Sequence, residues 1–148
     1  MPFVSVLHVD ELGAVDWPKA EEYRPVTPGL VAQAGDLLIS LLNPRFLRAA
    51  VVPERYEAVQ CSAEFGVFQA KCDPYAVLAL LHDPQVAAQL APLGRGTSSS
   101  RRRIQPDDVL SVLIPPVTST WLAERDGAVR NAMDQYTSAH LQLAALYG

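Results

Sequence analysis

The sequence predicts an α+β protein in which short strands come first and helices follow. Apolar runs separated by turn residues fill positions 3–70, a pattern typical of strands. Asp-Pro pairs at 73–74 and 83–84 mark two helix starts, because Asp is a favoured N-cap and Pro is favoured in the first turn. Apolar residues that recur every seven positions predict one long helix over about 118–147.

The composition suits a single soluble domain. Of the 148 residues, 49% are hydrophobic and 19% are charged, enough to bury a sizeable core. Cys61 and Cys72 form no C-x-x-C pair, so we expect no zinc site and a reduced compartment. We expect a cytoplasmic chain with no contact to a membrane, because no signal-peptide pattern and no membrane-length apolar run is present.

The first third of the chain is expected to consist of strands and loops. Residues 3–9 alternate well enough for a strand, and residues 10–13 supply a turn. A short second strand is a candidate at 15–17. Prolines interrupt residues 18–29, which predicts an ordered loop there. Residues 31–36 then lead into the central strand.

The stretch 35–52 predicts a strand, a basic loop and a second strand. Two runs rich in Leu, Ile and Val flank an Asn-Pro turn that carries Arg45 and Arg48. Further strands are expected at 58–61 and 64–70.

Beyond residue 70 the apolar period changes to that of helices. Residues 75–81 and the stretch from 84 to Leu90 predict two short helices, the second ended by a Pro and a Gly. Residues 94–103 form a polar, basic loop, and one helical turn is expected at 106–108.

Charge is unevenly distributed along the chain, whose formal net charge is -4. Residues 1–34 hold five acids and two bases (-3), and Asp36 adds -1. Residues 45–103 hold eight bases and five acids (+3), and 104–148 hold five acids and two bases (-3). The basic middle indicates a surface that faces a polyanion, because phosphate contacts depend on local Lys and Arg.

Six short motifs follow one another in a distinctive order. They are Gly-Asp-Leu-Leu-Ile-Ser, Ala-Ala-Val-Val, Cys-Ser-Ala-Glu-Phe-Gly-Val-Phe, Asp-Pro-Tyr-Ala-Val-Leu-Ala-Leu-Leu, Gly-Arg-Gly-Thr-Ser and Asp-Asp-Val-Leu-Ser-Val-Leu-Ile-Pro-Pro. Together they cover about residues 30–116. This order resembles one target recognition domain of a type I restriction–modification DNA specificity subunit. The resemblance implies a curled, β-helix-like mixed sheet with a helical hairpin over 1–116, and a long spacer and dimerisation helix over 117–148.

The resemblance also implies a function. The domain would bind double-stranded DNA in a sequence-specific manner, without catalysis or cofactor, and would position a methyltransferase subunit and a nuclease on their target. A full specificity subunit has two recognition domains and two such helices. This chain has one of each, so we expect a homodimer, or pairing with a second half-subunit, through the C-terminal helix.

The candidate DNA-binding residues lie in the two basic loops. Arginine's planar fork matches both phosphate and guanine, and a Gly-rich loop adds backbone N–H groups for phosphate. The alternative is that these are solvated loop residues without a partner. The candidates are Arg45, Arg48, Arg95, Thr97, Ser98, Arg101, Arg102 and Arg103.

The C-terminal helix carries a seam of apolar residues. A helix of about 30 residues spans roughly 45 Å, longer than a small domain is wide, so we expect it to need a partner surface. Packing on its own domain is the alternative. The seam consists of Leu122, Val129, Met133, Tyr136 and Leu143.

No catalytic constellation is apparent, and we expect no enzyme activity. His8, His82 and His140 lack metal-ligand spacing. Residues 43–46 are superficially similar to the Asn-Pro-Pro-aromatic motif of adenine methyltransferases, but arginine replaces the second proline and no glycine-rich loop precedes it. A second hypothesis is a non-catalytic protein-interaction adaptor that keeps the fold but does not read DNA, which the acidic pI favours.

Overall fold

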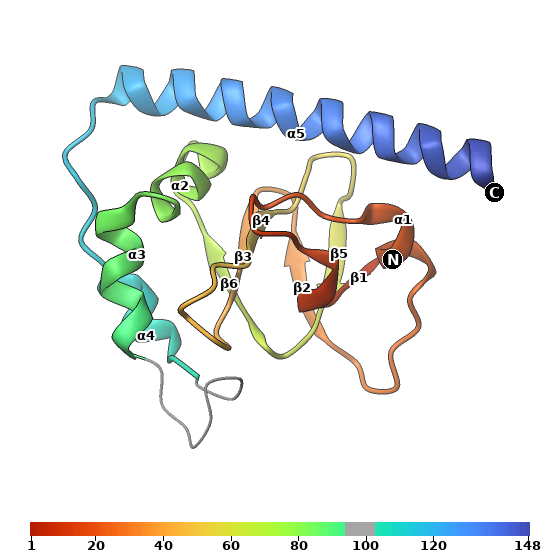
Figure 1. The fold of residues 1–148 in the computed structure, drawn as a ribbon, viewed down its shortest axis with the longest axis horizontal. Helices are drawn as coiled ribbons and strands as arrows, with labels where there is room; N and C mark the ends of the chain where they lie inside the picture. The colour runs from red at the N-terminus through yellow and green to blue at the C-terminus, as the bar shows by residue number, and fades with distance from the viewer. Residues whose placement is uncertain (94–102) are drawn as a thin grey trace.

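The structure is a computed structural model that describes residues 1–93 and 103–148 (Figure 1). Two small sheets and a group of short helices form one body, and a long helix runs along its whole length (Figure 1). Among the described residues, no helix is both long and apolar enough to span a membrane. The elements are β1 (Phe3–Val4), η1 (Val6–His8), α1 (Trp17–Glu22), β2 (Leu30–Gln33), β3 (Asp36–Ser40), β4 (Ala49–Val51), β5 (Ala58–Cys61), β6 (Phe65–Gln69), α2 (Pro74–Leu81), α3 (Pro84–Leu90), η2 (Ala91–Leu93), α4 (Pro106–Leu110) and α5 (Ser119–Tyr147).

Each sheet has three strands. In the first, β5 lies between β1 and β2, parallel to β1 and antiparallel to β2. In the second, β3 lies between β4 and β6, and both pairs are antiparallel. The expected α+β class, with mixed strand pairing, a helical pair α2–α3 and a long C-terminal helix, is confirmed.

The central strand β3 contributes to two hydrophobic cores. Successive side chains of a strand point to opposite faces. Leu38 packs into the core that contains Trp17, whereas Leu37 and Ile39 pack into the core beneath α2 and α5. Because β3 is buried on both faces, its run of apolar residues is continuous and does not alternate with polar ones.

The strand expected at 3–9 is wrong beyond Val4, because residues 6–8 form a 3₁₀ turn. The Ser5 hydroxyl accepts a hydrogen bond from the Leu7 N–H (3.1 Å), and the Ser5 N–H donates to Nδ1 of His8 (3.0 Å). These local side-chain bonds satisfy the backbone groups that a strand would have paired with a neighbour.

The short strand expected at 15–17 is corrected, and the loop expected at 18–29 is wrong only over 18–22; residues 23–29 form a loop as expected. Val15 forms an isolated bridge with Val9, and the chain then enters helix α1 at Trp17. Asp16 is its N-cap, accepting from the Lys19 N–H at 3.2 Å, with Pro18 in the first turn. Proline here starts a helix and does not break one.

Helix α2 is capped from another element. Asp73 adopts a left-handed backbone (φ 51°), and its side chain makes no capping bond, so the N-cap role expected from its sequence is not observed. The Tyr75 N–H instead donates to Oδ1 of Asp126 on α5, at 2.9 Å. By contrast, Asp83 caps α3 as expected, accepting from the Gln85 N–H at 2.8 Å.

Asp126 also fixes α5 on the body of the protein. The residue is 6% exposed, and its Oδ2 accepts from the Arg130 guanidinium at 2.9 Å. That guanidinium lies 5.4 Å from the centroid of the Tyr75 ring. Val129 and Met133 pack beside them on the core beneath α2. One buried carboxylate therefore joins the start of α2 to the middle of α5.

Replacing Asp126 with Ala tests this junction. The change leaves the buried Tyr75 N–H and the Arg130 guanidinium without their acceptor, so we expect the free energy of unfolding to fall by about 1–3 kcal/mol. Asp126→Asn keeps an acceptor oxygen and should lose less. Urea unfolding followed by circular dichroism measures both, with Glu124→Ala, an exposed site on the same helix, as control. A loss for Asp126→Ala no larger than that of the control would contradict the capping role.

Candidate nucleic-acid interface

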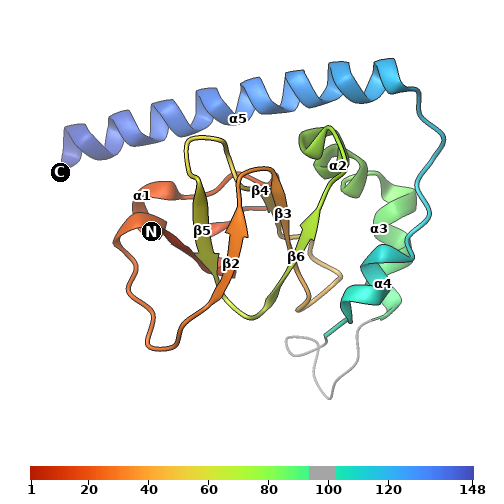
Figure 2. The same ribbon diagram turned by 180° about the vertical axis from the view of Figure 1, so that it is seen from behind.

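Three segments that are distant in sequence meet at one edge of the molecule. The Leu41 N–H donates to the carbonyl of Glu64, and the Ile104 N–H donates to the carbonyl of Leu41, both at 2.8 Å. Leu42 and Arg103 form an isolated antiparallel bridge. This edge, built on the β3–β4 loop, lies on the side of the molecule opposite α5 (Figures 1 and 2).

The β3–β4 loop is held at both ends by backbone hydrogen bonds. The Ser40 N–H donates to the Arg48 carbonyl (2.9 Å), which continues the strand pairing, and the Phe46 N–H donates to the Asn43 carbonyl (2.9 Å), which closes a turn. Asn43 has φ 53°, a left-handed conformation that Asn tolerates better than most residues. The Asn-Pro turn predicted from the sequence therefore displays its arginines from a defined backbone.

The two arginines of this loop differ in how they are held. Arg45 is exposed at the tip, with its guanidinium 6.0 Å from the centroid of the Phe46 ring. Arg48 is half-buried, and its Nη1 donates to the Leu47 carbonyl at 3.0 Å. Arg48 is thus more strongly oriented than Arg45.

Arg103 lies beside the β3–β4 loop, because the isolated bridge pairs it with Leu42. It is exposed, and its Nη2 donates to the carbonyl of Ala63 in the β5–β6 turn at 3.2 Å. Among the described residues, no acidic side chain lies within salt-bridge distance of Arg45, Arg48 or Arg103. We call these three arginines the basic edge; none of their charges is neutralised by a described carboxylate.

The basic edge accounts for three of the eight predicted DNA-binding residues. The other five lie outside the described residues: Arg95, Thr97, Ser98, Arg101 and Arg102.

A hollow of about 330 Å³ lies beside the basic edge. One wall comes from the β3–β4 loop, and the other comes from η1 and the residue that follows it. Sequence reasoning missed the second wall because residues 3–9 were expected to form a strand. The signal that predicts it is the spacing of Ser5 and His8, which matches the two ends of a capping box. The lining residues are Val6, Leu7, Val9, Leu42, Asn43, Phe46 and Arg48.

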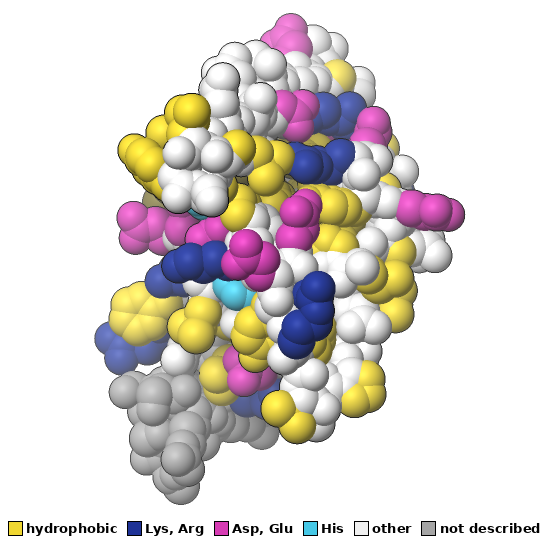
Figure 3. Space-filling model, turned by 90° about the vertical axis from the view of Figure 1, so that its right-hand side faces the viewer, with side chains coloured by type: hydrophobic (Ala, Val, Ile, Leu, Met, Phe, Trp, Pro, Cys, Tyr) yellow, Lys and Arg dark blue, Asp and Glu magenta, His cyan; other side chains and the backbone are white. Residues whose placement is uncertain are grey.

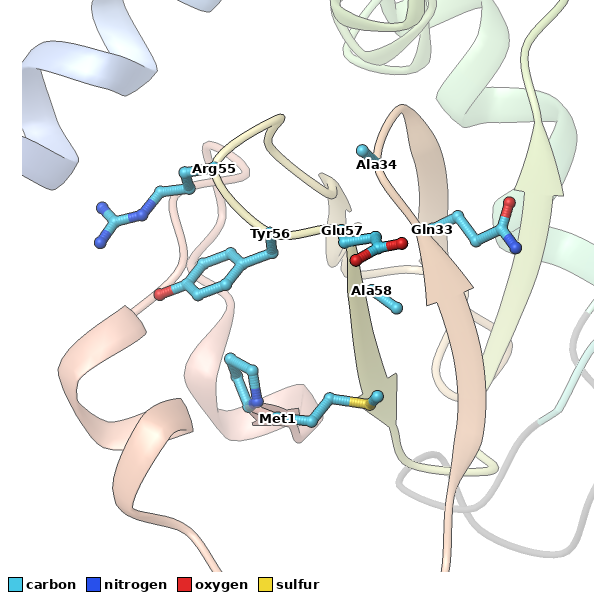
Figure 4. Close-up of a pocket in the computed structure, with 8 residues that line it drawn as sticks. Met1, Gln33, Ala34, Arg55, Tyr56, Glu57 and Ala58 are labelled. Carbon is cyan, nitrogen blue, oxygen red and sulfur yellow. The ribbon is translucent and has the colours of Figure 1, made fainter.

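A wider hollow, of about 800 Å³, lies between the N-terminus and the β4–β5 loop (Figure 4). Its polar groups do not converge: Arg55 and the hydroxyl of Tyr56 point one way, and Glu57 and Gln33 lie on the other side (Figure 4). The Tyr56 hydroxyl donates to Glu21, and burial together with this bond raises its pKa. Tyr56 is therefore a permanent hydrogen-bond donor that supports α1.

The histidines and acids do not assemble a metal centre in the described part of the chain. His82 contacts the carbonyls of Leu78 and Glu11 with its two ring nitrogens, and Nε2 of His140 lies 3.7 Å from a carboxylate oxygen of Asp16. Each histidine is thus occupied with a separate structural contact.

The apolar seam of α5 is divided between two environments. Val129 and Met133 pack on the core of their own domain, and Leu122 is half-buried. Tyr136 and Leu143 are 44% and 48% exposed. Figure 3 faces the end of the molecule that carries the C-terminus of α5, and there acidic, basic and hydrophobic side chains are interspersed. The outward part of the seam is consequently smaller than the sequence pattern suggests.

Comparison with known proteins defines the fold. No family model and no curated protein sequence matches the chain. The crystal structure of the HsdS subunit from Thermoanaerobacter tengcongensis superposes with a TM-score of 0.65 at 18% identity, covering 98% of this chain and 38% of that one. A second structure, from work on complex assembly and conformational transition of the type I restriction–modification system, gives 0.65 at 22% identity, covering 99% and 38%.

The chain therefore spans 38% of the length of each of these two proteins and shares their fold over that part. The expected fold of a target recognition domain followed by a long helix is confirmed.

The stability of η1, which forms one wall of the hollow, is expected to depend on pH. Burial lowers the pKa of His8 below its usual 6.5, against the opposing pull of Asp16. Protonation also removes the Nδ1 lone pair that accepts from the Ser5 N–H. Because the folded pKa is below the unfolded one, this contribution to stability is present above about pH 6.5 and is lost as pH falls through the folded pKa.

We expect His8→Gln to flatten the pH dependence of the free energy of unfolding below pH 6.5. Urea unfolding at pH 7.5, 6.5 and 5.5 for both proteins measures this, and the other two histidines cancel in the difference. An NMR titration should give a His8 pKa below 6.5 in the folded protein. Parallel stability curves, or an unshifted pKa, would contradict this account.

Proposed function

We propose that this chain is a sequence-specific DNA-binding module of a type I restriction–modification system, which holds a methyltransferase and a nuclease on their target. The observation that carries the proposal is the likeness in fold, over 98% of the chain and with the long helix included, to an HsdS subunit. The module itself is proposed to be non-catalytic.

The basic edge supports DNA contact on the side away from α5. Its arginines come from segments whose backbones are joined by hydrogen bonds, so their charges are presented together. Guanidinium groups without an internal ion pair are available for phosphates or base edges. The placement of α5 on the opposite side leaves that helix free for protein partners while DNA occupies the edge (Figure 1).

We further propose that α5 pairs with a second copy of the chain or with another half-subunit. Apolar side chains near its C-terminal end are exposed, with Leu146 at 75% and Tyr147 at 86%. Together with Tyr136 and Leu143 they form a surface that pairing would bury.

A protein-interaction adaptor without DNA binding is the second candidate. The observation that favours it is the net charge of -4 and the pI of about 5.3, which disfavour a polyanion at long range. The two candidates differ in whether the basic edge is used, and this is directly testable.

Selection of bound duplexes from a random DNA pool at low salt, with and without a methyltransferase subunit, tests the proposed function. We expect enrichment of a short motif. Arg45→Ala should reduce the salt dependence of binding, lowering the slope of log K against log salt by about 0.9 in size, because one phosphate contact is lost. Folded protein that enriches nothing in either condition supports the adaptor.

A double charge reversal, Arg45→Glu with Arg103→Glu, separates the two candidate functions. A DNA-binding module should lose affinity for all sequences, whereas an adaptor should keep its partner. Lys19→Glu, a reversal at an exposed site on α1, should leave DNA binding nearly unchanged.

Self-association through α5 is tested by sedimentation equilibrium. We expect wild-type protein to show twice the mass of one chain, and Leu143→Glu to shift it towards the monomer, because a charge would be buried in the pair. Gln142→Glu places the same charge at a neighbouring exposed position and should leave the mass unchanged. A wild-type protein that stays monomeric at high concentration contradicts pairing with itself and leaves another half-subunit as the partner.

A further inference from the structure

Two helices of this chain begin with the same pair of residues but are capped in different ways. Asp83 precedes Pro84 with φ −65° and ψ 129°, and its carboxylate accepts from the Gln85 N–H at 2.8 Å. Asp73 precedes Pro74 with φ 51° and ψ 57°, and its side chain makes no capping bond. Helix α3 therefore shows the conformation that an Asp-Pro start adopts when its own aspartate caps the helix.

Asp126 occupies the position that the Asp73 carboxylate would take. An N-cap side chain accepts from the backbone N–H two or three residues further along, and in α2 the first of these belongs to Tyr75. That N–H donates to Oδ1 of Asp126 at 2.9 Å. The acceptor from α5 thus replaces the local one and leaves the Asp73 side chain without a capping role.

The backbone of Asp73 is unfavourable while α5 is in place. A left-handed conformation is costly for a residue that has a side chain, and the residue before a proline prefers an extended backbone. Asp73 departs from both preferences. A change to the backbone seen at Asp83 would relieve this strain and bring the Asp73 carboxylate into capping position, as it does in α3.

The contact between α5 and the body holds further unfavourable groups. Nε of Arg130 and Nδ1 of His140 are both buried and have no hydrogen-bond partner among the described residues. Both residues lie on the side of α5 that faces the body, where Arg130 packs over Tyr75 and His140 approaches Asp16. Burying a polar atom without a partner costs free energy, which contact with water recovers. Lifting α5 would therefore relieve these two atoms as well as Asp73.

We propose that α2 exchanges caps when α5 moves. Asp126 caps α2 while α5 lies on the body, and Asp73 caps it once α5 is lifted away. The exchange keeps the helical pair α2–α3 folded in both states and offsets part of the cost of exposing Val129 and Met133. Helix α5 can then leave the body without unfolding of the domain. This conformational device goes beyond the proposed function and depends neither on DNA nor on a partner.

A double-mutant cycle tests the exchange in the full chain. Asp126→Ala vacates the acceptor position and represents the lifted state at this contact. In the wild-type background Asp73→Gly relieves the left-handed backbone, which glycine adopts freely, and this lowers the unfolding constant. In the Asp126→Ala background the same substitution removes the carboxylate that caps α2, and this raises the unfolding constant. We expect the two effects to differ by about 5-fold or more.

Two features make this comparison specific. The flexibility that glycine adds to the unfolded chain is the same in both backgrounds and cancels. Asp73→Asn is the matched control, because asparagine also caps helices and tolerates a left-handed backbone but lacks the charge. We expect Asp73→Asn to have nearly the same effect in both backgrounds. A difference as large as that of Asp73→Gly would mean that the two carboxylates only repel each other, and it would overturn the exchange.

Urea unfolding followed by circular dichroism gives the unfolding constants, and a crystal structure of the Asp126→Ala protein gives the backbone of residue 73. We expect that backbone to be extended, with its carboxylate bonded to the Tyr75 N–H. Equal effects of Asp73→Gly in both backgrounds, or a residue 73 that stays left-handed in Asp126→Ala, overturn the proposal.

A second variant keeps the test valid where Asp126→Ala does not fold. Asp126→Asn weakens the acceptor and keeps its shape, so the effect of Asp73→Gly should shift in the same direction by a smaller factor. An effect equal to that in the wild-type background overturns the proposal here as well.

Discussion

The buried carboxylate of Asp126 is the contact on which the arrangement of this protein depends. A helix start leaves backbone N–H groups without partners, and in most helices a neighbouring residue in the sequence supplies the acceptor. Here the acceptor for α2 is 51 residues away, on α5. The long helix therefore cannot leave the body without exposing both its own charge and the start of α2. Its other contacts include the apolar packing of Val129 and Met133, which is less directional, and the approach of Nε2 of His140 to Asp16 at 3.7 Å.

This junction places the two surfaces of the molecule on opposite sides. The helical pair α2–α3 is attached to α5 at this junction, through the start of α2. The basic edge lies on the far side of the sheets from α5 (Figure 1). Strand β3 connects the two regions, because one end of it enters the β3–β4 loop and its middle packs against both cores. A partner bound along α5 and a nucleic acid bound at the basic edge would not compete for space.

Much of the fold could be predicted from local sequence, and the failures share a physical cause. The strands β3 to β6 and helices α2, α3 and α5 follow from apolar periodicity and proline placement. The structure departs from the prediction over residues 5–8 and 17–22, because Ser5 and Asp16 redirect the backbone through side-chain bonds that hydrophobic patterns do not reveal. The capping of α2 by Asp126 links residues distant in sequence, so no local rule could predict it. For the same reason, local sequence could not predict that Arg103 lies close to the loop that carries Arg45 and Arg48.

The β3–β4 loop is closed at its base by the bond between the Ser40 N–H and the Arg48 carbonyl. Leu41 at the start of the loop packs with Leu90 and Ile104, and Leu47 is half-buried; residues 44–46 belong to none of the hydrophobic cores, so the sheets do not constrain their identity closely. The sequence at the tip of this loop can therefore change without disturbing the sheets that carry it. A protein built this way can acquire a new surface chemistry by changing a few neighbouring residues, while its folding and its attachment to α5 are inherited intact.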